Sequence, residues 1–245
     1  MIEDSVPHSV LTVKEILAYS SNIGTIKIAE SLGKNKIYNQ AKEFGFGSKT
    51  GLNPTGEESG TVYEAKRWSL SSMHSVPIGY EVSVTPIQIA MAYAAIANGG
   101  FLMKPLLVKQ IIDNNGKSIY TEDPEVIRKV SDSIVMKDLT KMLTRVVETG
   151  TGTSAYLPGW SIAGKTGTAE KFIDGEYSKT KYISNFAGFF PAENPQIVGV
   201  FVLNEPKYGF HWGGIGAAPI FRRVAKRIIN MDDSIQILKD KYKID

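Results

Sequence analysis

The hydrophobic period of the chain changes near residue 150, and this change restricts the choice of fold more than any other feature of the sequence. Before that point apolar residues recur at helical spacing, and after it they form extended runs. The predicted helices span about 13–19, 23–32, 86–97 and 134–148, the predicted strands span 161–169, 182–190 and 196–203, and a last amphipathic helix starts near Pro219. The chain therefore combines a helical part with a short sheet.

We expect an α/β (α+β) fold of two lobes with a ligand cleft between them. Residues 1–150 form a mostly helical lobe, residues 151–231 form a sheet lobe with a C-terminal helix packed on it, and residues 232–245 form a polar tail. The run 196–203 is nearly continuous in apolar residues, which is typical of a strand covered on both faces. The short link 191–195 predicts that the second and third strands form an antiparallel hairpin.

Two of the helices have clear start signals. Thr12 with Glu15, and Thr85 with Gln88, have the spacing of capping boxes, and Pro86 fits the first position of its helix. The alanine-rich helix after Thr85 is apolar on all sides, which predicts deep burial.

Composition and charge exclude several classes of protein. The chain has 28 basic and 25 acidic residues, scattered without a basic block, so we expect no nucleic-acid partner. It has no cysteine, and its three histidines are far apart in sequence, so we expect no metal site and no metal cofactor. No apolar run approaches the roughly 18 residues of a membrane span, and we expect no anchor or signal peptide in this chain.

Two short motifs carry the candidate chemistry. Ser20-Ser21-Asn22 is an S-x-N triplet at a junction between two predicted helices, and Lys165-Thr166-Gly167-Thr168 lies on the first predicted strand. Each motif is weak alone, because a serine-rich helix junction is most often a simple cap. Glycine in a strand is rarer, since it weakens the strand unless another backbone approaches closely. Together they match two members of a set linked to serine acyl transfer, S-x-x-K, S-D-N and K-T-G.

The residue types suit separate roles in that reaction. A lysine ammonium beside a serine hydroxyl can pass a proton to a leaving amine, and Ser20 and Lys165 are the candidates for this catalytic pair. Asn22 can bind a substrate amide. The Thr166 and Thr168 hydroxyls can bind a carboxylate, and Gly167 leaves room for an extended peptide. We predict that the Ser20 hydroxyl and the Lys165 ammonium lie within hydrogen-bonding reach.

Three blocks of the sequence resemble the transpeptidase domain of class B penicillin-binding proteins, the septum-forming, division-type kind. Residues 11–33 (LTVKEILAYSSNIGTIKIAESLG) resemble the S-x-N region of that family, and residues 79–100 (GYEVSVTPIQIAMAYAAIANGG) resemble its long buried helix. Residues 146–171 (VVETGTGTSAYLPGWSIAGKTGTAEK) are similar to its K-T-G strand with the preceding loop. The resemblance runs from about residue 8 to 229, in the family order.

The resemblance implies a penicillin-binding-protein/serine β-lactamase-like fold and a peptidoglycan D,D-transpeptidase activity through an acyl-serine intermediate. It assigns Ser20, Asn22 and Lys165 to catalysis and Thr166, Gly167 and Thr168 to substrate binding. It implies no organic cofactor. The implied partners are peptidoglycan stem peptides, β-lactam antibiotics and cell-division membrane proteins, and the implied location is the cell envelope, at the outer face of the cytoplasmic membrane.

One family motif is missing from its expected place. The S-x-x-K serine precedes S-x-N by several tens of residues in the family, and no S-x-x-K occurs among the 19 residues before Ser20. A formal match at residues 31–34 follows S-x-N and lies at a predicted helix C-terminus, where the partial negative charge opposes an activated oxyanion. We therefore expect that this chain lacks the nucleophile and the first strands of the sheet, and is inactive alone. The run 196–203 is then an uncovered edge.

Two other functions fit the same residues. A carboxypeptidase or β-lactamase of this fold uses similar motifs, and a hydrolysis assay on the completed domain distinguishes it. A truncated, non-catalytic fragment binds only peptide or a division partner, and a fluorescent penicillin tests it. Stable labelling of the isolated chain contradicts the expected absence of the nucleophile.

Overall fold

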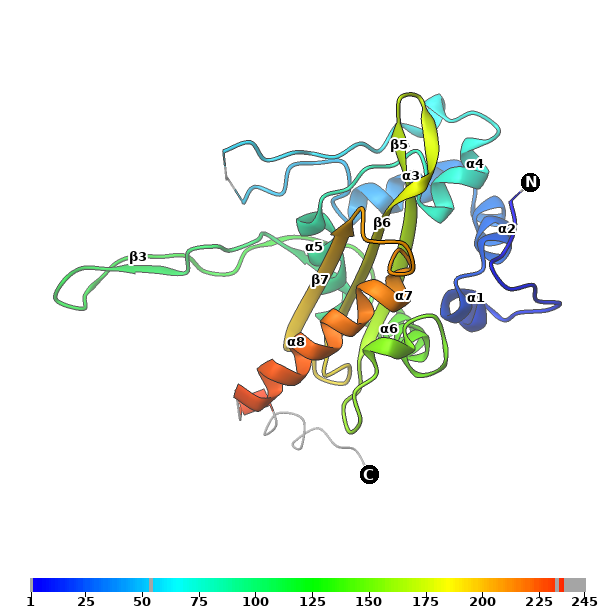
Figure 1. Cartoon of the computed structure of the whole chain (residues 1–245). Helices are drawn as coiled ribbons and strands as arrows, with labels where there is room; N and C mark the ends of the chain where they lie inside the picture. The colour runs from blue at the N-terminus through cyan, green and yellow to red at the C-terminus, as the bar shows by residue number, and fades with distance from the viewer. Residues whose placement is uncertain (1, 53–54, 232–233, 236–245) are drawn as a thin grey trace.

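The computed structural model describes residues 2–52, 55–231 and 234–235. Its helices and strands follow one another along the chain as shown in Figure 1. They are α1 (Val13–Tyr19), α2 (Asn22–Leu32), α3 (Lys34–Glu43), η1 (Ala65–Arg67), α4 (Ser72–Ser75), η2 (Val76–Ile78), α5 (Pro86–Ala97), β1 (Phe101–Met103), β2 (Gln110–Ile112), β3 (Ser118–Thr121), β4 (Val126–Lys129), α6 (Ser133–Thr149), η3 (Thr153–Ala155), β5 (Ala163–Ile173), β6 (Glu176–Phe190), β7 (Ile197–Asn204), α7 (Gly213–Gly216) and α8 (Ala218–Met231).

The central feature is an antiparallel sheet in the order β5–β6–β7. All three predicted strands and the predicted hairpin between β6 and β7 are confirmed. The first two strands are longer than predicted, because Asp174 and Gly175 form a two-residue turn with φ of 53° and 92°. Positive φ at both positions matches the twist of a β-hairpin, so β5 and β6 pair up to the turn.

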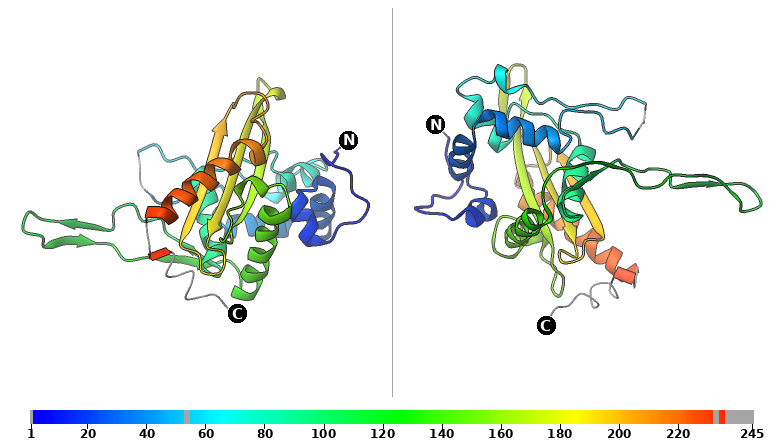
Figure 2. Two further views of the ribbon diagram at one scale, coloured as in Figure 1. Left: turned by 60° about the horizontal axis from the view of Figure 1, so that its bottom comes forward. Right: turned by 180° about the vertical axis from the view of Figure 1, so that it is seen from behind.

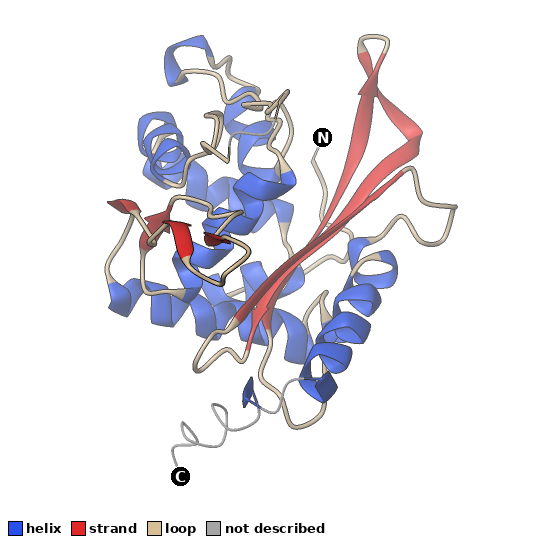
Figure 3. Ribbon diagram, turned by 90° about the vertical axis from the view of Figure 1, so that its left-hand side faces the viewer, coloured by secondary structure: helices blue, strands red, loops and turns tan. Residues whose placement is uncertain are grey.

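Helices cover both faces of this sheet (Figure 3). Phe186 and Phe190 of β6 point to one face, where their rings meet Phe221 of α8 at centroid distances of 4.9 Å and 5.9 Å. Phe189 points to the other face and packs in a cluster with Leu143 of α6. The alternation along β6 thus joins both layers into the core, and the expected C-terminal helix on the sheet is confirmed.

The packing between the predicted lobes is continuous. Val147 of α6 belongs to the same buried cluster as Phe186 and Phe221, although a boundary was expected near residue 150. That boundary remains a prediction. Of the expected tail 232–245, all but 234–235 lies outside the described residues.

Both predicted capping boxes are confirmed. The Thr12 hydroxyl accepts a hydrogen bond from the backbone N–H of Glu15, and the backbone N–H of Thr12 donates to the Glu15 carboxylate. Thr85 and Gln88 make the same exchange at the start of α5. Gln88 is buried, and its side-chain nitrogen also donates to the carbonyls of Ser48 and Ser59. Gln88 thereby ties the backbone at Ser48 and Ser59 to the helix.

Two parts of the first 150 residues differ from the expected pattern. Helix α2 ends at its C-cap Gly33 as predicted, and α3 starts directly after it, in a stretch for which the sequence pattern predicted no element. Strands β1 to β4 form two small two-stranded sheets, in addition to the three predicted strands. Strands β2 and β3 form an exposed hairpin that projects from the body (Figures 1 and 2). We call residues 105–124 the arm.

Strand β7 is an edge of the main sheet. In the described part of the chain it pairs with β6 on one side, and Val202 is 40% exposed. The expectation of an uncovered apolar edge is therefore confirmed.

Candidate active site

Ser20 lies in a tight junction between two helices. It ends α1 with φ 57° and ψ 43°, a left-handed conformation that is uncommon for a residue with a side chain. The next residue, Ser21, returns to an extended conformation and caps α2 by accepting a hydrogen bond from the N–H of Gly24. This reversal between two helices exposes the hydroxyl of Ser20.

Lys165, on strand β5, contacts this hydroxyl although it lies 145 positions further along the chain. Its Nζ donates to Ser20 Oγ at 2.8 Å and to the carbonyl of Thr166 at 3.0 Å. The predicted proximity of Ser20 and Lys165 is therefore confirmed. Burial removes water from the ammonium and lowers the pKa of Lys165 to about 8. A lysine with such a pKa exists in both protonation states near neutral pH, so it can give and take a proton.

The loop after α6 connects the two motif-bearing elements. The N–H of Thr151 donates to the carbonyl of Ala18 in α1 at 3.0 Å. The hydroxyl of Thr151 hydrogen-bonds that of Thr166 in β5 at 2.7 Å. A Cβ at Gly150 would lie 2.1 Å from the Ala18 carbonyl oxygen, so glycine is needed for this close approach.

Thr151 was not among the residues that the sequence selected. It stands in the run Thr149-Gly150-Thr151-Gly152-Thr153, where hydroxyls alternate with glycines directly ahead of the K-T-G strand. That alternation is the signal that could have identified it.

The K-T-G strand also packs tightly against the start of α7. Gly213 donates its N–H to Thr168 Oγ1 at 3.0 Å, which leaves the proton of the Thr168 hydroxyl available for a ligand. A Cβ at Gly213 would lie 2.5 Å from the Gly167 carbonyl oxygen, and a Cβ at Gly167 would meet the Asn185 side chain at 2.6 Å. Gly167 thus serves contacts within the protein, while the predicted room for a peptide remains a prediction.

The Asn22 side chain follows the Ser20–Ser21 junction, and its Nδ2 donates to the carbonyl of Glu3 at 3.1 Å. Its place in the catalytic set remains a prediction. Next to the triplet lies a cavity of about 490 Å³, whose described lining includes Asp4, His8 and Ser21 but no residue of the K-T-G strand. A pocket shared by both motifs therefore remains a prediction.

The described residues contain no group of three or more His, Cys, Asp or Glu side chains placed to hold a metal ion. No helix in the described part of the chain has the length and apolar character to cross a membrane. The chemistry available at the contact is proton transfer between a lysine and a serine, beside hydroxyls suited to a carboxylate.

The fold and this lysine–serine contact agree with a family of acyl-transfer enzymes. The model of the penicillin binding protein transpeptidase domain matches residues 2–226, and the chain belongs to this family.

Within the family, its relatives are of the class B kind. The chain is 36% identical over 220 residues to stage V sporulation protein D of Bacillus subtilis, covering 89% of this chain and 34% of that protein. It is 33% identical to the peptidoglycan D,D-transpeptidase FtsI of Escherichia coli, covering 98% of this chain and 40% of that protein. Penicillin binding protein 3 of Mycobacterium tuberculosis, solved with aztreonam, aligns with a TM-score of 0.85 and 31% identity over 94% of this chain and 54% of that structure. The chain thus spans little more than a third of these two curated relatives.

Proposed function

We propose that this chain forms the S-x-N and K-T-G parts of the active site of a peptidoglycan D,D-transpeptidase. Its substrates are peptide stems of peptidoglycan, and β-lactams occupy the same site. The observation that carries the proposal is the contact of 2.8 Å between Lys165 Nζ and Ser20 Oγ, two residues 145 positions apart. Relatives named as D,D-transpeptidases, such as FtsI, support the choice of reaction.

In the proposed reaction a serine hydroxyl adds to the carbonyl of a D,D-peptide bond. The C–N bond breaks, the acyl group stays on the serine, and the amine leaves with a proton. The proton of the attacking hydroxyl passes to Lys165 as the new C–O bond forms. Ser20 gives its own hydroxyl proton to the leaving amine and is reprotonated by Lys165, which is supported by the lowered pKa of Lys165. The amine of a second stem then attacks the acyl carbon, the C–O bond to the serine breaks, and the proton lost by that amine returns to the serine oxygen.

Thr166 and Thr168 bind the terminal carboxylate of the donor stem in this proposal. Thr168 Oγ1 accepts from Gly213, so its own proton is free to donate to the ligand. Asn22 binds a substrate amide after its side chain leaves the Glu3 carbonyl.

The nucleophilic serine comes from a segment outside residues 1–245. The sequence before Ser20 contains no S-x-x-K, and two formal matches follow it. Ser31 lies in the last turn of α2 and donates to the carbonyl of Ile28. Ser178 lies in strand β6, where its hydroxyl accepts from the backbone N–H of Lys181. We further propose an envelope location at the outer face of the cytoplasmic membrane, with cell-division membrane proteins as partners, by analogy with FtsI.

Labelling with a fluorescent penicillin tests the function. The isolated chain should give no stable covalent label on a denaturing gel. The chain joined to an S-x-x-K segment of a class B relative should be labelled, and Lys165→Ala should slow this labelling by about 10²–10⁴-fold. Lys171→Ala is the matched control, because Lys171 lies on the same strand but pairs with Glu205.

Three outcomes contradict the proposal in different ways. A label on the isolated chain, located by mass spectrometry, would show that the chain holds its own nucleophile. No label on the joined protein would favour a non-catalytic fragment. Hydrolysis of the penicillin with rapid turnover would favour a β-lactamase.

A further inference from the structure

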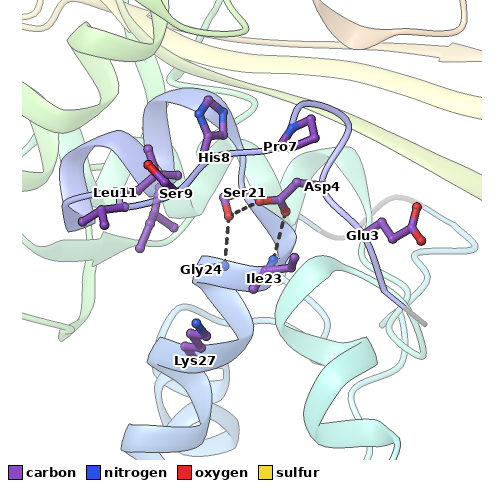
Figure 4. Close-up of a pocket in the computed structure, with 12 residues that line it drawn as sticks. Glu3, Asp4, Pro7, His8, Ser9, Leu11, Ser21, Ile23, Gly24 and Lys27 are labelled. Atoms are coloured by element: carbon purple, nitrogen blue, oxygen red, sulfur yellow. Dashed lines mark hydrogen bonds between the residues drawn. The ribbon is translucent and has the colours of Figure 1, made fainter.

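The segment before α1 lies against the start of α2 (Figure 4). Asp4 uses both of its carboxylate oxygens there. Oδ2 accepts a hydrogen bond from Ser21 Oγ at 2.7 Å, and Oδ1 accepts from the backbone N–H of Ile23 at 3.0 Å. Asp4 therefore holds the residues just before and just after Asn22.

Ser21 is the centre of this network. Its hydroxyl donates to Asp4 and accepts from the N–H of Gly24 at 2.9 Å. Ser21 is only 3% exposed, so water cannot easily replace a lost acceptor, and an unsatisfied buried hydroxyl costs about 1–3 kcal/mol.

Helix capping alone does not account for Asp4. Ser21 already caps α2 through its own hydroxyl. What Asp4 adds is a fixed orientation for the capping residue, since the donated proton of Ser21 points to Oδ2.

The conformation of Ser20 makes this orientation important. A non-glycine residue with φ 57° is strained, and such strain persists only where the surroundings fix it. Ser20 follows α1 and precedes the clamped Ser21, so movement of Ser21 would allow the backbone of Ser20 to relax. The Lys165 contact would then lengthen. Asn22 is held in the same way by the carbonyl of Glu3, the residue before Asp4.

We propose that Asp4 is a positioning residue for the S-x-N motif, which keeps Ser20 in reach of Lys165 through Ser21. The importance of Asp4 for catalysis rests on the proposed function. Asp4 acts through its neighbours, and it does not touch the reacting atoms.

The charge state of Asp4 agrees with this role. Burial alone raises its pKa, but the hydrogen bonds from Ser21 and from the backbone of Ile23 and Asn22, together with the nearby His8, hold the pKa of Asp4 below its ordinary value. The carboxylate therefore stays ionised at neutral pH, which strengthens the bonds it accepts.

Nuclear magnetic resonance of the isotope-labelled chain tests the proposal. The Lys165 side-chain carbon signals report its pKa, and the backbone shifts of Ser20 report its left-handed conformation. In Asp4→Ala, the Ser20 shifts should move to those of an ordinary residue. The Lys165 pKa should rise from about 8 toward the ordinary lysine value, because water enters the opened contact.

Other variants separate positioning from folding. Ser21→Ala should shift the Ser20 and Lys165 signals in the same direction, and adding Asp4→Ala to it should add little, because both changes break one network. Asp4→Asn retains an acceptor for the Ile23 N–H and should give a smaller shift. Glu3→Ala is the matched control, because the exposed Glu3 contributes its backbone carbonyl and not its side chain, and it should leave both signals in place.

A folded Asp4→Ala chain with unchanged Ser20 and Lys165 signals would overturn the proposal. Should Asp4→Ala fail to fold, unchanged signals in Asp4→Asn and Ser21→Ala would overturn it equally. A Lys165 pKa near the ordinary lysine value in the unsubstituted chain would instead contradict the proposed function, so the two failures are distinguishable.

Discussion

Lys165 contacts Ser20 in the candidate site, and its charge lowers the stability of the folded chain. Its side chain is partly buried, and the resulting loss of hydration lowers its pKa to about 8. In the unfolded chain the same lysine has a pKa of about 10.4. The unfolded state therefore binds the proton more tightly, and Lys165 opposes folding wherever both states are charged.

The sign of the pH dependence follows from that difference. Below pH 8 both states carry the ammonium, and the folded state bears the whole cost. As the pH rises from about 8 to 10.4, the folded state loses its proton first and the cost from Lys165 disappears. The contribution of this one residue to the free energy of unfolding should rise in that window, measured as the difference between the chain and Lys165→Met in urea unfolding.

Lys165→Met should raise stability at pH 7. The methionine keeps the length of the side chain without its charge, and we expect a gain on the order of 1 kcal/mol, or about 2–4 °C in Tm. Lys171→Met is the control, since it breaks a surface ion pair with Glu205 and should lower Tm slightly or not at all. A lower Tm for Lys165→Met would contradict the buried-charge interpretation.

Gly150 tests the link between α1 and the K-T-G strand. Gly150→Ala places a Cβ against the Ala18 carbonyl, so α1 has to move away from β5. We expect a loss of about 1–3 kcal/mol in urea unfolding, together with shifted Ser20 signals. Gly33→Ala has no atom within 4 Å of its Cβ but a φ of +79°, so it should cost backbone strain alone and leave the Ser20 signals unchanged.

Interactions between residues close in sequence could be predicted from the sequence. The capping boxes at Thr12 and Thr85 are confirmed, because the interactions that define a cap lie within four residues. Asp4 could not be found in this way, because its partner Ser21 lies 17 positions away and no local periodicity marks that contact. Thr151, whose partner Thr166 lies 15 positions away, was marked only by the alternation of hydroxyls and glycines ahead of the K-T-G strand.

Among the helices and strands, the predictions were right where a buried face dictates the pattern. Helix α6 and the strands of the main sheet have such faces. Helix α3 contains no buried residue, and β2 and β3 are exposed throughout, so hydrophobic spacing does not report them. The end of β5 was missed because the Asp174-Gly175 turn, a common hairpin signal, was not recognised.

The arm should be dispensable for the fold. Lys104 and Glu125 are joined by a backbone hydrogen bond, so an Asn-Gly turn can replace residues 105–124. We expect a change below about 1 kcal/mol in thermal unfolding, because the strands of the arm bury no side chain. Leu102→Ala is the contrasting variant, since Leu102 is 1% exposed and its loss should cost about 2–5 kcal/mol. A large loss on removal of the arm would contradict this.

At the scale of the whole molecule, we expect the open edge of strand β7 to control self-association of the chain. An unpaired apolar edge is a template for another strand, so the isolated chain should self-associate as its concentration rises, measured by sedimentation velocity. Val202→Lys puts a charge on this edge and should weaken the association. Ile134→Lys is the control, because Ile134 is 74% exposed but lies on α6. Equal effects of both variants would indicate nonspecific hydrophobic association instead of pairing at this edge.

The approach of Ser20 to Lys165 was anticipated from the family resemblance. Periodicity and capping describe segments, and they do not say which segments meet. The match of the S-x-N and K-T-G motifs to one catalytic set supplied that information. The resemblance also assigns Asn22 to catalysis; its amide donates to the Glu3 carbonyl, and its catalytic role remains a prediction.

The 145 positions between Ser20 and Lys165 also set the order of events during synthesis. A ribosome releases the S-x-N junction long before it makes the K-T-G strand, so for most of its time as a nascent chain Ser20 has no lysine to meet. Contacts between such distant residues form late and slowly. The Ser20–Lys165 hydrogen bond therefore cannot form until synthesis has passed Lys165, and the shorter nascent chains lack this part of the site.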